Sequence, residues 1–128
     1  MILTTFHLES SLTSPLDEGP LGGFNTGPLE GNGVLGAVSA VLSFRDVVPQ
    51  RHTTQFVLQG YSGGAIATGW ALQQSFTSNF LTNLQSHIVG ALIGGLPTNA
   101  TRDLLNLNGA IGSGLVVASL AGQYNVYA

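Results

Sequence analysis

The 128-residue chain contains no cysteine, no lysine and few charged side chains of either sign. The lack of cysteine excludes disulfides and thiolate metal sites, although it does not fix the cellular compartment. Charged residues make up 7% of the chain, against roughly 25% in typical soluble domains, so charge cannot cover its surface. We therefore expect much of that surface to be buried against further polypeptide or an apolar partner.

Basic patches and long apolar runs are also absent from the sequence. The formal net charge is −3, which gives no case for nucleic-acid binding. No apolar run reaches the roughly 18–20 residues that span a bilayer, so no transmembrane segment is expected. Residues 1–7 lack the basic start and the small-residue cleavage site of a signal peptide. We predict neither a cofactor nor a metal site.

What the chain does contain is a short apolar strand, a glycine turn with one serine, and a small-residue helix, in that order. The turn Gly60-Tyr61-Ser62-Gly63-Gly64 matches G-x-S-x-G, the nucleophile elbow in which a strand precedes the serine and a helix follows it. Such a turn holds the serine in a sparsely populated backbone region. The flanking glycines let the strand and the helix approach each other. The simpler alternative is a turn in which Ser62 only caps the helix.

The segments around this turn predict an α/β fold. Apolar spacing indicates a helix from residue 32 or 33 to residue 44, and a second helix is expected from Gly63 to about Phe76. The apolar run Ile88–Ile93 predicts a buried parallel strand, so that strand, helix and strand form a right-handed βαβ unit. A further helix is predicted to begin within residues 102–108, and no closing element is evident after it.

The first 31 residues are predicted to form a short strand over residues 1–8 and then a loop. Within this loop Asp17-Glu18-Gly19-Pro20 is interpreted as an active-site carboxylate or, more simply, as a solvated turn. The stretch Gly31–Gly36 matches the G-x-G-x-x-G dinucleotide fingerprint. No strand precedes it, so nucleotide binding is a weak hypothesis. Asn99-Ala100-Thr101 is an N-glycosylation sequon, a triplet that also arises often by chance.

Three stretches resemble the fungal secretory lipases, the lipase-A-type enzymes of the α/β-hydrolase fold. Gly60–Ala71 resembles their nucleophile elbow, Asp17–Pro20 is similar to their acidic-Glu-Gly-Pro stretch, and Ile88–Gly95 is similar to their next strand and turn. The resemblance implies a fragment of a single α/β-hydrolase domain, a partial core of parallel strands with crossover helices. In it residues 1–31 form strand and loop, residues 32–95 the core with the elbow, and residues 96–128 the start of a helical lid region.

The resemblance also implies an activity, that of a secreted triacylglycerol lipase of lipid catabolism. The substrate would be a lipid ester, with a lipid–water interface as a candidate place of action. Ser62 would be the nucleophile and the backbone N–H of Gly63 an oxyanion donor. The family's Asp and His lie far downstream of the serine, beyond residue 128. We therefore expect the chain alone to be inactive or nearly so.

The histidines of the chain are poor candidates for the catalytic base. His7 and His52 precede the serine, against the Ser–acid–His order of this fold. His52 and His87 stand at the amino ends of predicted strands, opposite the reacting end, and Asp103 follows His87 in the wrong order. The alternative function is a non-catalytic interaction module whose exposed apolar sheet edge binds a partner or a lipid surface.

Overall fold

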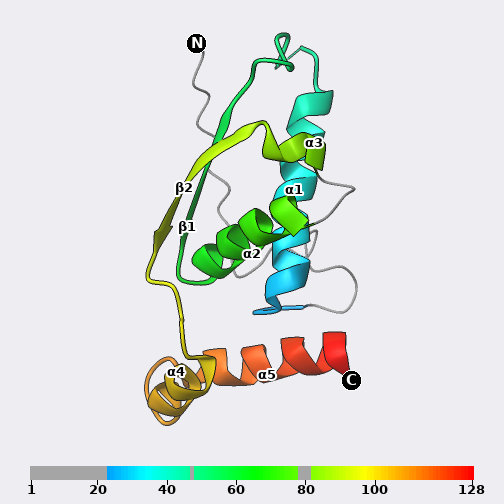
Figure 1. The fold of residues 1–128 in the computed structure, drawn as a ribbon. Coiled ribbons are helices and arrows are strands. Elements are labelled where there is room, and N and C mark those ends of the chain that lie inside the picture. Colours follow the sequence, from blue (N-terminus) through cyan, green and yellow to red (C-terminus); the bar gives the residue numbers. More distant parts are fainter. Residues whose placement is uncertain (1–22, 47, 78–81) are drawn as a thin grey trace.

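The computed structural model of the chain describes residues 23–46, 48–77 and 82–128. The predicted strand over residues 1–8 and the acidic Asp17–Pro20 stretch lie outside these residues. In the described part, two long helices pack beside a parallel pair of strands, and two further helices follow (Figure 1). The elements in chain order are α1 (Gly27–Ser43), β1 (Phe56–Tyr61), α2 (Gly63–Thr77), α3 (Thr82–Gln85), β2 (Ile88–Gly94), α4 (Ala100–Leu107) and α5 (Ser113–Tyr127).

The predicted strand–helix–strand unit is present, and with it the α/β class at its coarse level. β1 and β2 run parallel, and their register continues without a shift from the Val57–Gly90 pair to the Tyr61–Gly94 pair. α2 connects the strands, and the short α3 lies in the connection before β2. None of the helices in the described ranges is long and apolar enough to cross a membrane.

Helix α1 begins earlier than the sequence predicts, so the expectation of a loop up to Gly31 is wrong. Pro28 lies in its first turn, where the fixed φ of proline suits a helix and its missing N–H is not needed. Gly27 and Gly31 serve close packing on α2. A Cβ at Gly27 would come within 1.8 Å of Trp70 Nε1, and one at Gly31 within 2.8 Å of the Ala71 backbone nitrogen. Trp70 thus fills the contact between the two helices.

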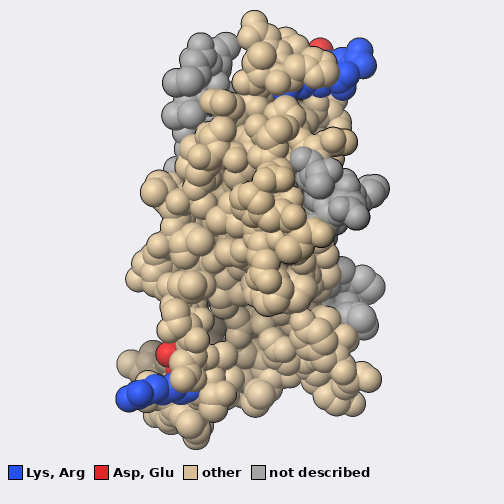
Figure 2. All heavy atoms as spheres, in the orientation of Figure 1, with Lys and Arg blue, Asp and Glu red and all other residues tan. Residues whose placement is uncertain are grey.

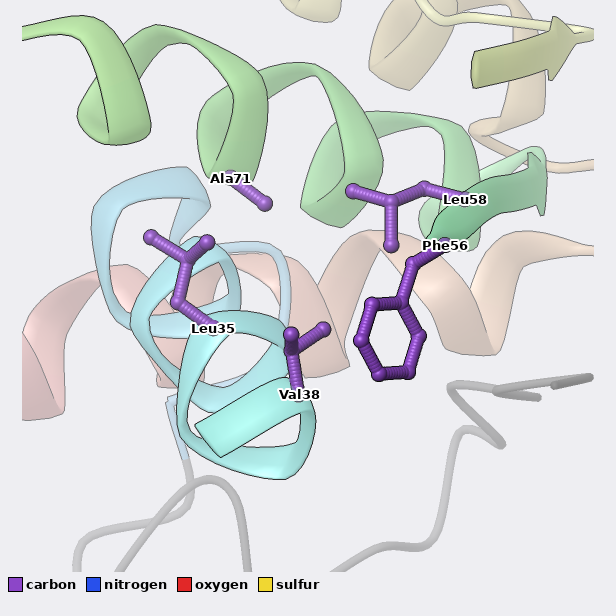
Figure 3. Close-up of a cluster of buried hydrophobic side chains, with 5 residues drawn as sticks. All are labelled: Leu35, Val38, Phe56, Leu58 and Ala71. Atoms are coloured by element: carbon purple, nitrogen blue, oxygen red, sulfur yellow. The ribbon is translucent and has the colours of Figure 1, made fainter. Parts of the chain in front are cut away.

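The hydrophobic core lies between α1, β1 and α2. Five buried side chains from these elements meet there, as Figure 3 shows: Leu35, Val38, Phe56, Leu58 and Ala71. Burial of a leucine or phenylalanine side chain contributes about 1.5–3 kcal/mol, so this cluster is the main source of cohesion in the described part. The core therefore lies where α1 packs against β1 and the middle of α2.

Strand β2 differs from its prediction. The sequence indicates a buried strand, but Val89, Leu92 and Ile93 are 49%, 61% and 42% exposed. Within the described residues β2 pairs with β1 alone, so its other edge is unpaired, and Leu92 and Ile93 leave both faces of its carboxyl half exposed. Only its Ala91 and Ile88 pack against the core cluster.

Helices α4 and α5 account for the stretch in which the sequence shows no closing element. The Asn99 side-chain oxygen caps α4 by accepting from the Arg102 backbone N–H at 3.0 Å. α5 lies across the chain segment that enters α1 (Figure 1). There Asn25 Nδ2 donates to Ser119 Oγ at 2.9 Å, and the Gln123 side-chain amide donates to the Asn25 carbonyl.

Candidate active site

Ser62 occupies the single position between the last residue of β1 and the first residue of α2. Its φ is +55°, in the left-handed region that costs a non-glycine residue roughly 1–2 kcal/mol. Hydrogen bonds fix both the N–H and the carbonyl of the residue. Its N–H donates to the Gly94 carbonyl at 3.0 Å, and its own carbonyl accepts from the N–H groups of Ala65 and Ile66 at 3.0 and 3.3 Å. The sparsely populated backbone predicted for this serine is therefore present.

Gly60 lets the strand and the helix approach each other at this turn. A Cβ on Gly60 would lie 2.0 Å from the Gly64 carbonyl oxygen and 2.6 Å from Thr68 Oγ1. No side chain fits into such a gap, so any larger residue must push α2 away from β1. The prediction that this glycine serves close approach is confirmed.

A simple capping role does not describe Ser62. An N-cap serine has β-region backbone angles and accepts a hydrogen bond from the first helical turn through its side chain. Ser62 has a positive φ, and its Oγ makes no hydrogen bond to the described part of the chain. The residue is exposed, so its hydroxyl is accessible to a substrate.

The first turn of α2 presents backbone donors next to this hydroxyl. The N–H of Gly63 belongs to the helix end, where no intrahelical acceptor exists. No backbone hydrogen bond among the described residues uses it, and a Cβ at Gly63 would meet nothing within 4 Å. The positive end of the helix dipole also favours negative charge at this place. The turn can therefore accommodate an oxyanion beside Ser62 Oγ.

The carboxyl end of β2 forms the other wall of the site, a feature that sequence reasoning did not assign. The Tyr61 ring lies against Gly94 and Gly95, and a Cβ at either glycine would come within 3.0 Å of ring carbons. Gly95 also has a φ of +58°, which favours glycine. Tyr61 is nevertheless 78% exposed. The signal available in the sequence was the Gly94-Gly95 pair, which directly follows the predicted strand Ile88–Ile93.

No histidine of the described residues stands near the serine. His52 is in the exposed turn before β1, and His87 precedes β2, with its Nδ1 at 2.8 Å from the Thr54 carbonyl oxygen. β1 is six residues long, so these amino ends lie roughly 20 Å from the Ser62 end of the sheet. Asp103 lies in the first turn of α4, and His7 falls outside the described residues.

The other candidate sites gain no support from the fold. Gly31–Gly36 lies inside α1, where Gly31 packs on α2, so this stretch forms no phosphate-binding loop after a strand. Across the described ranges, no group of three or more His, Asp and Glu side chains is placed to hold a metal ion.

Comparisons with known proteins point to one family. A family model described as secretory lipase matches residues 7–128. Secreted triacylglycerol lipase LIP3 of Malassezia restricta is 37% identical over 118 residues, which cover 91% of this chain and 24% of the relative. Lipase 10 of Candida albicans is 34% identical, with 86% and 23% covered. Secreted triacylglycerol lipase LIP5 of Malassezia furfur is 36% identical, with 99% and 32% covered.

The match is therefore to one part of longer proteins. The chain spans about a quarter to a third of the length of these curated relatives. No solved structure matches the chain significantly.

Proposed function

Because the chain belongs to the secretory lipase family, we propose that it carries the catalytic nucleophile of a secreted ester hydrolase that acts on triacylglycerols. The observation that carries the proposal is the left-handed backbone of Ser62 between β1 and α2. A serine in this conformation costs folding free energy that glycine would avoid. Such strain is found at functional sites, and here it positions an exposed hydroxyl as a nucleophile at the end of a strand.

In the proposed reaction Ser62 Oγ attacks the ester carbonyl carbon. The Oγ–carbon bond forms, the carbonyl oxygen takes the electron pair, and the serine proton passes to a base. The Gly63 N–H donates to the resulting oxyanion, a contribution of about 2.7–4 kcal/mol for one such donor. Collapse of the intermediate expels the protonated alcohol, and water then releases the fatty acid and restores the serine.

The base comes from outside the described residues. A free serine hydroxyl is a weak nucleophile at neutral pH, and His52 and His87 both stand at the far end of the sheet. Without an aligned His and acid, only the oxyanion donors and substrate binding contribute to catalysis. We therefore expect this chain alone to turn over esters slowly or not at all.

The fold is interpreted in the same terms. We assign β1, α2 and β2 to the core of an α/β-hydrolase sheet, and α4 with α5 to the start of the helical lid region. The order of strand, serine turn, helix and parallel strand supports this assignment. The three segments 1–31, 32–95 and 96–128 are accordingly parts of one domain.

The surface around the site suits an apolar substrate. Charged side chains of the described residues gather at two ends of the face in Figure 2, and the broad area between them carries none. At the carboxyl end of β2, Leu92 and Ile93 are exposed beside the Ser62 turn. These features support a lipid ester as substrate and a lipid–water interface as the place of action.

A non-catalytic interaction module is the second candidate function. Exposed apolar side chains on and before α5 favour it, because they could bind a partner or a lipid surface: Ile111, Val117, Leu120, Tyr124 and Tyr127. This function does not account for the positive φ of Ser62. It predicts no preferential reaction of that hydroxyl with electrophiles.

Active-site labelling separates the two functions. The chain is treated with an alkyl fluorophosphonate, and the modified serines are identified by mass spectrometry. We expect Ser62 to react at least about tenfold faster than Ser86, an exposed serine that precedes β2 and lies away from the start of α2. The reason is that the end of α2 stabilises the oxyanion-like adduct at Ser62. The Ser62→Ala variant should lose the rapid phase and Ser86→Ala should keep it. Equal rates at both serines would refute the nucleophile assignment.

A further inference from the structure

The start of α4 carries the one N-x-Ser/Thr triplet of the 128-residue sequence, Asn99-Ala100-Thr101, with Asn99 as the residue before the helix. All three residues are exposed. Asn99 stands directly before α4 and two residues after Pro97, and the position after the asparagine is alanine rather than the proline that would block modification. The triplet is therefore accessible in the folded chain and has the required composition.

The two polar atoms of the Asn99 side chain have different partners. Its Oδ1 accepts from the Arg102 backbone N–H at 3.0 Å and so caps α4. Its Nδ2 makes no hydrogen bond within the described part of the chain. An N-linked glycan is attached to Nδ2 and leaves the amide oxygen as an acceptor. The helix cap and a glycan can thus coexist on the same side chain.

We propose that Asn99 is an N-glycosylation site. In the reaction a bond forms between Nδ2 and the anomeric carbon of an oligosaccharide, and the bond from that carbon to the pyrophosphate of its lipid carrier breaks. The amide proton goes to the transferase, and the lipid pyrophosphate leaves. The proposal rests on the proposed function in one respect, because a secreted protein passes through the compartment that holds this donor.

The glycan would be attached at a place where the protein surface is largely apolar and carries few charged side chains. Leu96 and Leu105 flank the site in sequence and are 43% and 69% exposed. The only charged side chains on α4 are those of Arg102 and Asp103. A glycan is bulky and strongly hydrated, so it would keep this apolar neighbourhood soluble during secretion. It would project from the start of α4, past the carboxyl end of β2.

The test uses the whole 128-residue chain behind a secretion leader in a yeast host. The analysis is made on the leader-cleaved chain, from medium and cells together, so that neither poor secretion nor poor folding hides the result. A glycan is scored as a mobility shift removed by an endoglycosidase, and by conversion of residue 99 to aspartate on enzymatic release. Ser62 labelling is measured separately, so failure of the nucleophile assignment leaves this result unaffected.

Matched variants keep the helix cap and change only the acceptor chemistry. We expect the shift in the wild-type chain and in Thr101→Ser, which retains the hydroxyl. We expect it to vanish in Thr101→Ala and in Asn99→Asp, which can still cap α4 through its carboxylate. Absence of the shift in the leader-cleaved wild-type chain would overturn the proposal. A shift that persists in Asn99→Asp would do the same, because it would place the glycan elsewhere.

Discussion

The part of the molecule built from α1, β1 and α2 differs from the part built from β2, α4 and α5 in how its apolar residues are used. The first part buries Leu35, Val38 and Phe56 to 1–2% exposure. The second part leaves Leu92 61% exposed, and Ile111, in the link between α4 and α5, is fully exposed. The chain thus has one region that holds itself together and one whose apolar surface is largely uncovered within the described residues.

This difference shows where the Ser62 conformation is stabilised. The strained turn belongs to the first part, the one with the buried core, where Gly60 allows β1 to lie close to α2. The second part, which is the open part, contributes one backbone hydrogen bond: the Ser62 N–H donates to the Gly94 carbonyl. The backbone geometry of the elbow should therefore depend strongly on contacts in the first part and weakly on the docking of α5. Three pairs of substitutions test this comparison.

The largest effect is expected at Gly60, with Gly90 as the matched control on the neighbouring strand. In Gly60→Ala the new Cβ would meet the Gly64 carbonyl oxygen at 2.0 Å, so α2 must shift, and we expect a loss of about 3 kcal/mol in the free energy of unfolding. A Cβ at Gly90 would meet nothing within 4 Å, so Gly90→Ala should gain up to about 1 kcal/mol.

Urea unfolding followed by circular dichroism measures both variants. The comparison concerns the midpoints, and it is valid if the denaturant slope is the same for the variants and the wild-type chain. Equal losses at Gly60 and Gly90 would show that the two strands are packed alike, which would contradict the difference between the two parts.

A smaller and local effect is expected at Gly122, where α5 contacts the entry to α1. A Cβ at Gly122 would lie 2.1 Å from the Phe24 carbonyl oxygen, so Gly122→Ala should lift α5 from this segment. Gly114→Ala, in the same helix, meets nothing within 4 Å and should leave the docking intact. We expect amide hydrogen exchange in α5 to speed up about tenfold in Gly122→Ala, which corresponds to about 1.4 kcal/mol.

The exchange data also test whether the two parts are independent. Exchange in β1 and α2 should not change in either glycine variant of α5. Equal acceleration in α2 would show that α5 docking supports the elbow, and the division into a packed part and an open part would then be wrong.

The sequence predicts the elbow well because its signals are local. Gly60, Ser62 and the small residues that follow lie within a few positions of one another, and steric demands between neighbours determine the turn. The same reason explains why the limits of α2 match the prediction, whereas the parallel pairing of β1 with β2 follows from the general rule for a strand–helix–strand unit. The catalytic roles of Ser62 and Gly63 stay predictions, because catalysis also requires a base and a substrate, and neither is part of this turn.

The features that the sequence does not predict depend on distant contacts. Gly27 and Pro28 resemble loop residues, and the packing of Gly27 against Trp70 is visible only in the fold. The exposure of β2 depends on what covers it, which its own apolar run cannot specify. The docking of α5 rests on Asn25 and Ser119, 94 positions apart, and nothing in the composition of either segment indicates that they meet.

The smallest effect concerns Ser62 itself, where function and stability should oppose each other. Ser62→Gly removes the left-handed strain of about 1–2 kcal/mol and adds about 0.5–1 kcal/mol of chain entropy to the unfolded state, so the net gain should be about 1 kcal/mol. Ser62→Ala keeps the φ of +55° and removes only an exposed hydroxyl, so its unfolding midpoint should stay close to that of the wild-type chain. Both variants should lose the rapid reaction with the fluorophosphonate. A less stable Ser62→Gly would mean that the turn relaxes in solution, since glycine can weaken this position only if the left-handed backbone is not the one that the folded chain adopts.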